Sequence, residues 1–369
     1  MKKISGLFTI FILALICGAT WSQQPQKPAS PGLAAGGPVI QGTPEDPHRD
    51  PREIHLRNIR QITSGGTNAE AYFSPDGNRL IFQSTREPYK CDQMFVMNID
   101  GSDAHLVSTG NGKTTCGYFF KDGKRVLYSS TQLSNSECPP RLDYSKGYVW
   151  GVYSSFQIFA ANDAGEIVKQ LTVGPAYNAE ATLSTDGKKI VLTSSRDGDL
   201  EIYTMNVDGS SEKRLTQILG YDGGPFFSHD GKWIVYRASH PTAPEEVARY
   251  KELLAQELVE PMKMDLYVMR SDGSEQKQIT RLGGASFAPS FYPDDQRIIF
   301  ASNYENPGTS QFELYSISRE GGAPDRMTHA GGFNSFPMFS PDGKRLVFAS
   351  NRNAKQPREI NVFVADWIH

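Results

Sequence analysis

Short segments that alternate apolar and polar residues, separated by turn sequences, run along most of the chain. The clearest turn sequence, FSPDG, occurs at residues 73–77 and again at 339–343. Ser, Pro, Asp and Gly in this order suit a type I turn, because Pro presets the backbone at the second position. The segment RLIFQS (79–84) after the first copy alternates as a half-buried strand does. Each copy therefore predicts a turn between two antiparallel strands.

Degenerate copies of this unit recur between the two pentapeptides. The equivalent turn positions are separated by 46, 64, 44, 64 and 48 residues, and they are 77, 123, 187, 231, 295 and 343. A repeat in the mid-forties is the length of one four-stranded propeller blade, and two of the repeats carry an insertion of about 20 residues. Six such units predict an all-β fold, a six-bladed β-propeller of four-stranded antiparallel blades.

The N-terminal strand is predicted to close the ring. The sixth copy ends after its third strand, NVFVADW (361–367), whereas IHLRNIRQIT (54–63) precedes the first copy and has no blade of its own. Pairing of these segments would remove the exposed sheet edges at which the ring would otherwise open. Residues 54–369 are therefore predicted to form one domain, with the two FSPDG turns in neighbouring blades.

The first 22 residues differ in kind from the rest. Lys2 and Lys3 precede an apolar run over residues 7–16, and small residues follow up to Ser22. The run is shorter than the roughly 20 residues that span a bilayer, and it is typical of a secretory signal peptide. An exported protein, periplasmic or secreted, with no transmembrane segment in its mature chain, is expected.

Residues 23–53 are rich in Pro, Gly, Ala and Gln and show no apolar period, which predicts a disordered tether. The formal net charge of −3 gives no sign of a nucleic-acid partner. A monomer without a cofactor is expected.

Asp197, Asp199 and Glu201 form a possible Ca²⁺ ligand set, but it lacks the further carboxylates and the Gly of an EF-hand loop. The histidines show no metal-ligand spacing.

Two units resemble a known family. FSPDGNRLIFQSTREPYKCDQMFVMNIDG (73–101) and LSTDGKKIVLTSSRDGDLEIYTMNVDG (183–209) are similar to the WD40-like PD40 repeats of the TolB-type six-bladed propellers. The resemblance covers roughly residues 54–369 and implies the fold. It also implies protein–protein recognition in the bacterial periplasm, where TolB partners a peptidoglycan-associated lipoprotein and inner-membrane Tol proteins. An α/β domain precedes the propeller in TolB, and residues 23–53 stand in that place here.

Both insertions, at about 131–154 and 239–263, lie between the second and third strands of their repeats and so share one rim of the ring. Long loops on a rigid scaffold are where binding residues gather. The second insertion predicts a short helix in blade 4, either docked on the ring or acting as a lid or partner surface. The residues at helical spacing and at the expected ends are Thr242, Glu245, Val247, Tyr250, Leu254, Leu258 and Pro261.

The insertion rim carries the candidate binding residues. Aromatic side chains of the first insertion, Tyr148 and Trp150 among them, either fill the loop's own core or bind a sugar or a partner. At the channel mouth, carboxylates would face arginines that either tie the rim together or bind a polar ligand or peptide. The full set of candidate ligand-binding or partner-binding residues is Glu70, Arg86, Tyr118, Tyr148, Trp150, Glu180, Arg196, Tyr221, Asp222 and Arg237.

Cysteine usage fits an oxidising compartment. Cys91, Cys116 and Cys138 map to one sector of the insertion rim, so one disulfide is expected, with all three pairings open and an inert third thiol.

These features together predict an exported binding or scaffolding protein whose partner is an envelope protein or peptide, with a glycan as a further candidate. The alternative is an enzyme or glycan-processing protein with its site at the channel mouth. No catalytic residue is assigned.

Overall fold

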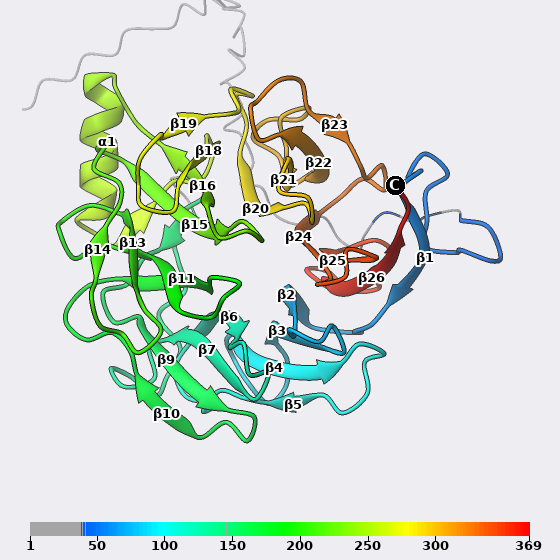
Figure 1. The fold of residues 1–369 in the computed structure, drawn as a ribbon, viewed down its shortest axis with the longest axis horizontal. Coiled ribbons are helices and arrows are strands. Elements are labelled where there is room, and N and C mark those ends of the chain that lie inside the picture. Colours follow the sequence, from blue (N-terminus) through cyan, green and yellow to red (C-terminus); the bar gives the residue numbers. More distant parts are fainter. Residues whose placement is uncertain (1–37, 39, 41, 145–146) are drawn as a thin grey trace, which may run out of the picture.

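Six four-stranded antiparallel sheets surround a central axis in the computed structural model (Figure 1). The structure describes residues 38, 40, 42–144 and 147–369. The predicted six-bladed propeller is confirmed. The predicted signal peptide, residues 1–22, and the first part of the predicted tether lie outside the described residues. No helix in the described part of the chain is long and apolar enough to cross a bilayer.

The first three blades follow one another along the chain, each running from its innermost to its outermost strand. Blade 1 contains β2 (Thr67–Phe73), β3 (Arg79–Thr85), β4 (Gln93–Asn98) and β5 (His105–Leu106). Blade 2 contains β6 (Thr114–Phe119), β7 (Arg125–Ser130), β9 (Gln157–Asn162) and β10 (Ile167–Gln170). Blade 3 contains β11 (Asn178–Leu183), β12 (Lys189–Ser194), β13 (Glu201–Asn206) and β14 (Lys213–Arg214).

The next two blades have the same order. Blade 4 contains β15 (Tyr221–Phe227), β16 (Trp233–Ser239), β18 (Asp265–Arg270) and β19 (Lys277–Gln278). Blade 5 contains β20 (Ser286–Phe291), β21 (Arg297–Ser302), β22 (Glu313–Ser318) and β23 (Asp325–Arg326). The innermost strand of every blade runs from the rim that carries the insertions toward the rim that carries the SPDG-type turns.

Blade 6 combines strands from both ends of the described chain. It contains β24 (Asn334–Phe339), β25 (Arg345–Ser350), β26 (Asn361–Trp367) and, outermost, β1 (Leu56–Gln61). β1 runs antiparallel to β26, with Leu56 opposite Trp367 and Gln61 opposite Phe363. The two FSPDG turns lie in adjacent blades, because Arg345 of blade 6 donates to the Gly77 carbonyl oxygen of blade 1 at 2.9 Å.

We expect Leu56→Ala to lower the free energy of unfolding by about 2–4 kcal/mol, since the side chain is fully buried among residues of blades 5 and 6. Arg60→Ala on the same strand, where the side chain is exposed, should change it by no more than about 0.5 kcal/mol. Urea denaturation measures both. Equal effects would show that β1 is not packed into blade 6.

Every innermost strand is interrupted by a β-bulge at the same place. The register shifts within each of the six inner strand pairs, and one residue of each bulge has a φ between 49° and 59°. These six residues are Glu70, Cys116, Glu180, Gly224, Ala288 and Phe336. A bulge re-aims side chains relative to a regular strand.

The helix of blade 4 differs from the prediction at both ends. α1 spans Pro244–Leu254, and its N-cap is Ala243, without a side-chain cap, rather than Thr242. The helix ends at Leu254, before Leu258, and the chain then turns with a φ of 57° at Glu257. Leu258 instead lies in β17 (Leu258–Val259), which pairs antiparallel with β8 (Trp150–Gly151) of the first insertion. The two insertions are thereby joined to each other.

Residues 42–53, predicted to be part of the disordered tether, pack against the ring. Glu53 is fully buried and forms an ion pair with the fully buried Arg352 at 3.1 Å. Asp46 accepts a hydrogen bond from the backbone N–H of Ile59 in β1 at 3.0 Å. The composition of this segment predicts a tether, but two of its charged residues, Asp46 and Glu53, find buried partners on the ring, which composition does not show.

Candidate functional site

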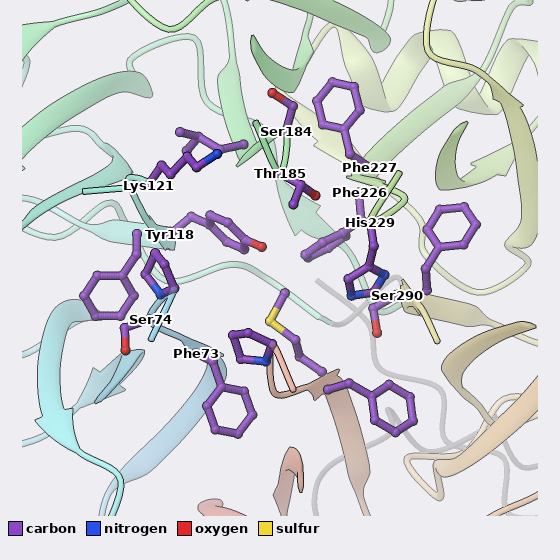
Figure 2. Close-up of a pocket in the computed structure, with 17 residues that line it drawn as sticks. Phe73, Ser74, Tyr118, Lys121, Ser184, Thr185, Phe226, Phe227, His229 and Ser290 are labelled. Carbon is purple, nitrogen blue, oxygen red and sulfur yellow. The ribbon is translucent and has the colours of Figure 1, made fainter. Parts of the chain in front are cut away.

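A pocket of about 340 Å³ lies at the end of the central channel where the innermost strands finish (Figure 2). Its walls come from all six blades, because the last residues of each innermost strand and the turn that follows them meet around the axis. The lining residues are Phe73, Ser74, Pro75, Tyr118, Phe119, Lys121, Leu183, Ser184, Thr185, Phe226, Phe227, His229, Ser290, Phe291, Met338, Phe339 and Pro341.

Aromatic side chains form the floor of this pocket. Tyr72 lies 5.8 Å from Tyr118 and 5.6 Å from Phe226 between ring centroids, so three blades meet in one aromatic cluster. Tyr118, Phe226 and Met338 are only partly buried and present apolar surface to the pocket. Burial raises the pKa of Tyr118 to about 12, so its phenol stays neutral. The floor therefore suits an apolar group.

The rim of the pocket is polar and carries positive charge. Lys121 is exposed at the rim, where Ser184 and Thr185 add hydroxyl groups. The ring Nδ1 of His229 lies 2.9 Å from Asp295 Oδ1, and Asp295 also accepts the backbone N–H groups of residues 229 and 230. Among the lining residues, all within the described part of the chain, none is Asp or Glu. The pocket thus combines an apolar interior with a polar rim that holds Lys121, and the Asp295 carboxylate lies beside His229.

This pocket lies on the rim opposite to the one that carries the insertions, where the sequence predicts binding. Of the ten predicted binding residues, Tyr118 alone lines it. A sequence signal for the pocket does exist, because an aromatic or large aliphatic residue precedes the turn in every repeat. These strand-end residues are Phe73, Phe119, Leu183, Phe227, Phe291 and Phe339.

Four of the predicted residues come together inside the opposite channel mouth. Glu180 accepts hydrogen bonds from Tyr221 Oη at 2.9 Å, and Arg237 forms an ion pair with the same carboxylate. Thr193 Oγ1 and the backbone N–H of Gly224 donate to Glu180 Oε2 at 2.7 and 2.9 Å. Trp150 covers the cluster, since the Arg237 guanidinium lies 5.2 Å from its ring centroid. The Glu180 carboxylate is therefore fully engaged within the protein.

Glu70 and Cys116 lie beside this cluster. Burial raises the pKa of Glu70 to about 7, with the Cys116 thiol and the Arg237 charge opposing the shift and the Glu180 charge adding to it. Burial and the charges of Glu70 and Glu180 also hold the pKa of Cys116 well above its usual value. A raised pKa favours the protonated thiol, which is a poor nucleophile, and the inert role of Cys116 stays a prediction.

Arg86 and Arg196 make hydrogen bonds to residues of the rim, a geometry that agrees with the first of their two predicted roles. Arg86 Nε donates to Ser84 Oγ at 2.8 Å, and its Nη2 donates to Asn68 Oδ1 at 2.6 Å. Arg196 repeats this pattern in blade 3, with Ser194 and Asn178 as acceptors at 3.0 and 2.9 Å.

The remaining predicted residues also make contacts within the rim. Asp222 is buried and lies 2.9 Å from His240 Nε2. Tyr148 Oη accepts a hydrogen bond from Trp150 Nε1 at 3.2 Å. Cys91 and Cys138 form a disulfide that links the first blade's loop to the first insertion, and Cys116 is the free thiol.

The proposed Ca²⁺ ligands are tied to donors of the protein. Asp197 accepts from Tyr203 Oη at 2.5 Å, and Asp199 accepts from the backbone N–H of Gly220 at 3.0 Å. Glu201 forms an ion pair with Arg214 at 2.5 Å. Over the described residues no group of three or more His, Cys, Asp or Glu side chains is placed to hold a metal ion.

Comparisons with known sequences find a family model that matches part of the chain. The PD40 model of the TolB beta propeller domain matches residues 249–366. An uncharacterised protein of Agrobacterium fabrum is 29% identical over 119 residues, 32% of this chain and 34% of that protein. Dipeptidyl-peptidase 5 of Porphyromonas endodontalis is 28% identical over 117 residues, 32% of this chain and 15% of that enzyme. The matched segments thus span about a third or less of these relatives.

Solved structures extend the likeness to most of the ring. A putative TolB from Agrobacterium tumefaciens superposes with a TM-score of 0.56 at 19% identity, over 84% of this chain and 97% of that chain. TolB from Acinetobacter baumannii superposes with a TM-score of 0.53 at 17% identity, over 82% of this chain and 63% of that chain. At these identities the likeness concerns the fold alone. The chain is therefore a six-bladed β-propeller that is similar in fold to TolB propellers, and its residues 249–366 match the PD40 model of the TolB beta propeller domain.

Proposed function

We propose that this protein is a non-catalytic binding protein that receives a short segment of a partner protein in the pocket at the turn end of its channel. The observation that carries the proposal is the pocket itself, an apolar funnel of about 340 Å³ with Lys121 at its rim and no acidic side chain among its lining residues. Charge complementarity selects a segment in which Asp or Glu stands next to a bulky apolar residue.

The dimensions of the pocket favour an extended segment over a folded surface. A volume near 340 Å³ is at the lower end for small-ligand pockets and admits one or two large side chains. Aromatic anchors that enter a desolvated pocket supply most of the energy of many interfaces. The floor formed by Tyr118, Phe226 and Met338 offers such a pocket, while the hydroxyl groups of Ser184 and Thr185 suit the polar backbone of the segment.

The place of action that we propose is the periplasm or the cell exterior. The signal-peptide pattern of residues 1–22 supports export, and the Cys91–Cys138 disulfide suits an oxidising compartment. The similarity to TolB propellers agrees with an envelope role and with a protein partner. The folded domain that we propose is the ring over residues 54–369, extended by the packed residues 42–53.

An enzymatic site is the second candidate, and one observation favours it. Glu70 lies in the channel with a pKa near 7, a value suited to proton transfer. However, its neighbour Glu180 is held by protein donors and Trp150 covers the cluster, so the Glu180 carboxylate is not free to act together with Glu70. If the channel mouth were catalytic, Glu70→Gln would abolish the activity, whereas pocket variants would not.

Selection from a random peptide library displayed on phage tests the proposal. The enriched peptides should share an acidic residue beside a bulky apolar one. Thr185→Trp, which fills the entrance from an exposed position, should weaken binding of the synthetic consensus peptide at least about tenfold, and Lys121→Ala about fivefold. The reason is that the first variant blocks the apolar floor and the second removes the rim charge.

The matched control is Thr109→Trp, an exposed threonine in a crossover on the insertion rim, which should leave the affinity unchanged. Fluorescence anisotropy measures all the affinities. The proposal fails if no consensus emerges, or if Thr185→Trp and Thr109→Trp bind the peptide equally well.

A further inference from the structure

The contacts between neighbouring blades are here called seams, and three of the six share a pattern. A side chain at the start of the third strand of one blade accepts a hydrogen bond from an Asn amide at the start of the innermost strand of the next. Asn178 donates to Gln157 at 3.1 Å in the seam of blades 2 and 3. Asn334 donates to Glu313 Oε2 at 2.9 Å in the seam of blades 5 and 6. Asn68 and Asn361 repeat the contact at 3.3 Å where blades 6 and 1 meet.

The seam between blades 3 and 4 breaks this pattern. Glu201 occupies the acceptor position, but Asp222 stands where these three seams have the donating Asn and where the two remaining seams have Thr114 and Ser286. One oxygen of each carboxyl group is engaged, Glu201 Oε1 with Arg214 and Asp222 Oδ1 with His240. The other two, Glu201 Oε2 and Asp222 Oδ2, are buried and have no hydrogen-bond partner.

The surroundings cannot supply both missing donors. Thr216 interacts with both carboxyl groups, but its hydroxyl has one proton to give, and its oxygen already accepts the backbone N–H of Ile202 at 2.9 Å. Two ionised carboxylates would therefore face each other in a site shielded from water. The other charged or titratable groups that act on the pair are Asp199, Arg214, Tyr236, His240, Tyr250 and Tyr267.

We infer that Glu201 and Asp222 share one proton at neutral pH, one carboxyl group donating to the other in place of the missing amide, and that loss of this proton loosens the seam between blades 3 and 4. With this proton the seam has the same hydrogen bond as the seam of Glu313 and Asn334, where the Asn334 amide donates at any pH. A buried polar group without a partner costs far more than one that is paired.

Titration of the two groups agrees with this arrangement. Burial raises the pKa of Glu201 from its ordinary 4.5 to about 7, and the charge of Asp222 adds to the shift. Burial also raises the pKa of Asp222, against the opposing effect of His240. A carboxyl group whose pKa is raised by folding binds more protons in the folded state, so stability falls as the pH rises from about 4.5 to about 7.

Contact with Asp222 also raises the pKa of His240. The effect on stability has the same direction as that of Glu201, because the ion pair between His240 and Asp222 is lost as the pH rises through the pKa of His240.

The same seam anchors the helical insertion. Tyr250 of α1 donates to Asp199 Oδ1 at 2.5 Å and lies 2.7 Å from the carbonyl oxygen of Gly220, two residues before Asp222. Asp199 also accepts the backbone N–H of Gly220. Repulsion between Glu201 and Asp222 would therefore weaken the attachment of α1 first, which makes the insertion responsive to pH.

Thermal unfolding between pH 5 and pH 9 tests the inference with four forms of the full chain. The wild type should lose roughly 3 °C in Tm over this range. Glu201→Gln supplies a permanent amide donor and should lose clearly less. Glu313→Gln, the matched control in the seam of blades 5 and 6, should keep the pH dependence of the wild type. Asn334→Asp recreates the carboxyl pair in that seam and should increase the dependence.

Infrared difference spectroscopy adds a reading that does not depend on stability. The wild type at neutral pH should show the carbonyl band of a protonated carboxyl group, and Glu201→Gln should lose it. The inference is overturned if that band is absent from the wild type, if Glu201→Gln keeps the full pH dependence, or if Asn334→Asp adds none. Should Glu201→Gln fail to fold, the wild-type spectrum and Asn334→Asp decide the question.

Discussion

Replacement of Glu53 by Ala is expected to lower the free energy of unfolding by about 3–5 kcal/mol, because it leaves a buried guanidinium without its counter-charge. Both Glu53 and Arg352 are fully buried, and two nitrogens of Arg352 contact the carboxylate at 3.1 and 3.2 Å. Arg352 also donates to the backbone carbonyl of His48 at 2.9 Å. Urea denaturation of the full chain measures the loss.

A neighbouring exposed ion pair provides the control. Arg52 contacts Asp50 at 2.9 Å, but its side chain is 64% exposed. Water screens this pair, so Arg52→Ala should change the free energy of unfolding by less than about 1 kcal/mol. Equal losses in the two variants would mean that residues 42–53 do not belong to the folded domain.

Arg237→Met should also be strongly destabilising, by about 3–5 kcal/mol, because Glu180 would lose the cation that balances its charge in the channel. The same change removes a charge that lowers the pKa of Glu70, so that pKa should rise further above 7. Trp150 would lose the guanidinium on its face, and its fluorescence should change. Denaturation and fluorescence measure these effects.

Arg249→Met is the matched control for this second variant. Arg249 pairs with Glu260 at 2.7 Å within the blade 4 insertion, where both side chains are about one-third exposed. Its loss should cost no more than about 1 kcal/mol. Comparable losses for Arg237→Met and Arg249→Met would contradict the closed, charge-paired state of the channel mouth.

Repetition in the sequence explains why the fold could be predicted. A strand, an SPDG-type turn and a second strand recur six times, and each turn is local, so the composition of five residues suffices to place it. The pairing of β8 with β17 could not be predicted, because it joins insertions of two blades that are not neighbours and depends on how both loops pack. The uncapped start of α1 at Ala243 likewise reflects tertiary packing.

The arginines of the insertion rim show a second limit of what the sequence predicts, which is the direction of a side chain. Arg86 and Arg196 bind rim residues, whereas Arg237 reaches the channel, although all three stand near the C-terminal ends of second strands in the sequence. The difference is one of register. Arg237 lies within β16 opposite Gly223, while Arg86 and Arg196 lie just beyond the ends of β3 and β12. Alternate residues of a strand face opposite sides, so an odd offset reverses the direction of the side chain.

The position of the pocket could not be inferred from any single repeat. One hydrophobic residue before each turn is expected in a blade for packing alone, and only closure of the ring brings the six strand ends into one funnel. The long insertions led to the prediction of a binding site on the opposite rim. Much of the surface of the two insertions is instead buried where they pack against each other. Buried residues there include Val152, Phe156, Val259 and Met264.

Methyl resonances of the methionines test most directly whether partners bind at the turn end of the channel. Met338 lines the pocket, whereas Met264 is buried beneath the two insertions. On addition of the selected peptide to protein with isotope-labelled methionine methyl groups, the Met338 signal should shift while the Met264 signal stays in place. A shift of Met264 with Met338 unchanged would contradict the account and place binding on the insertion rim.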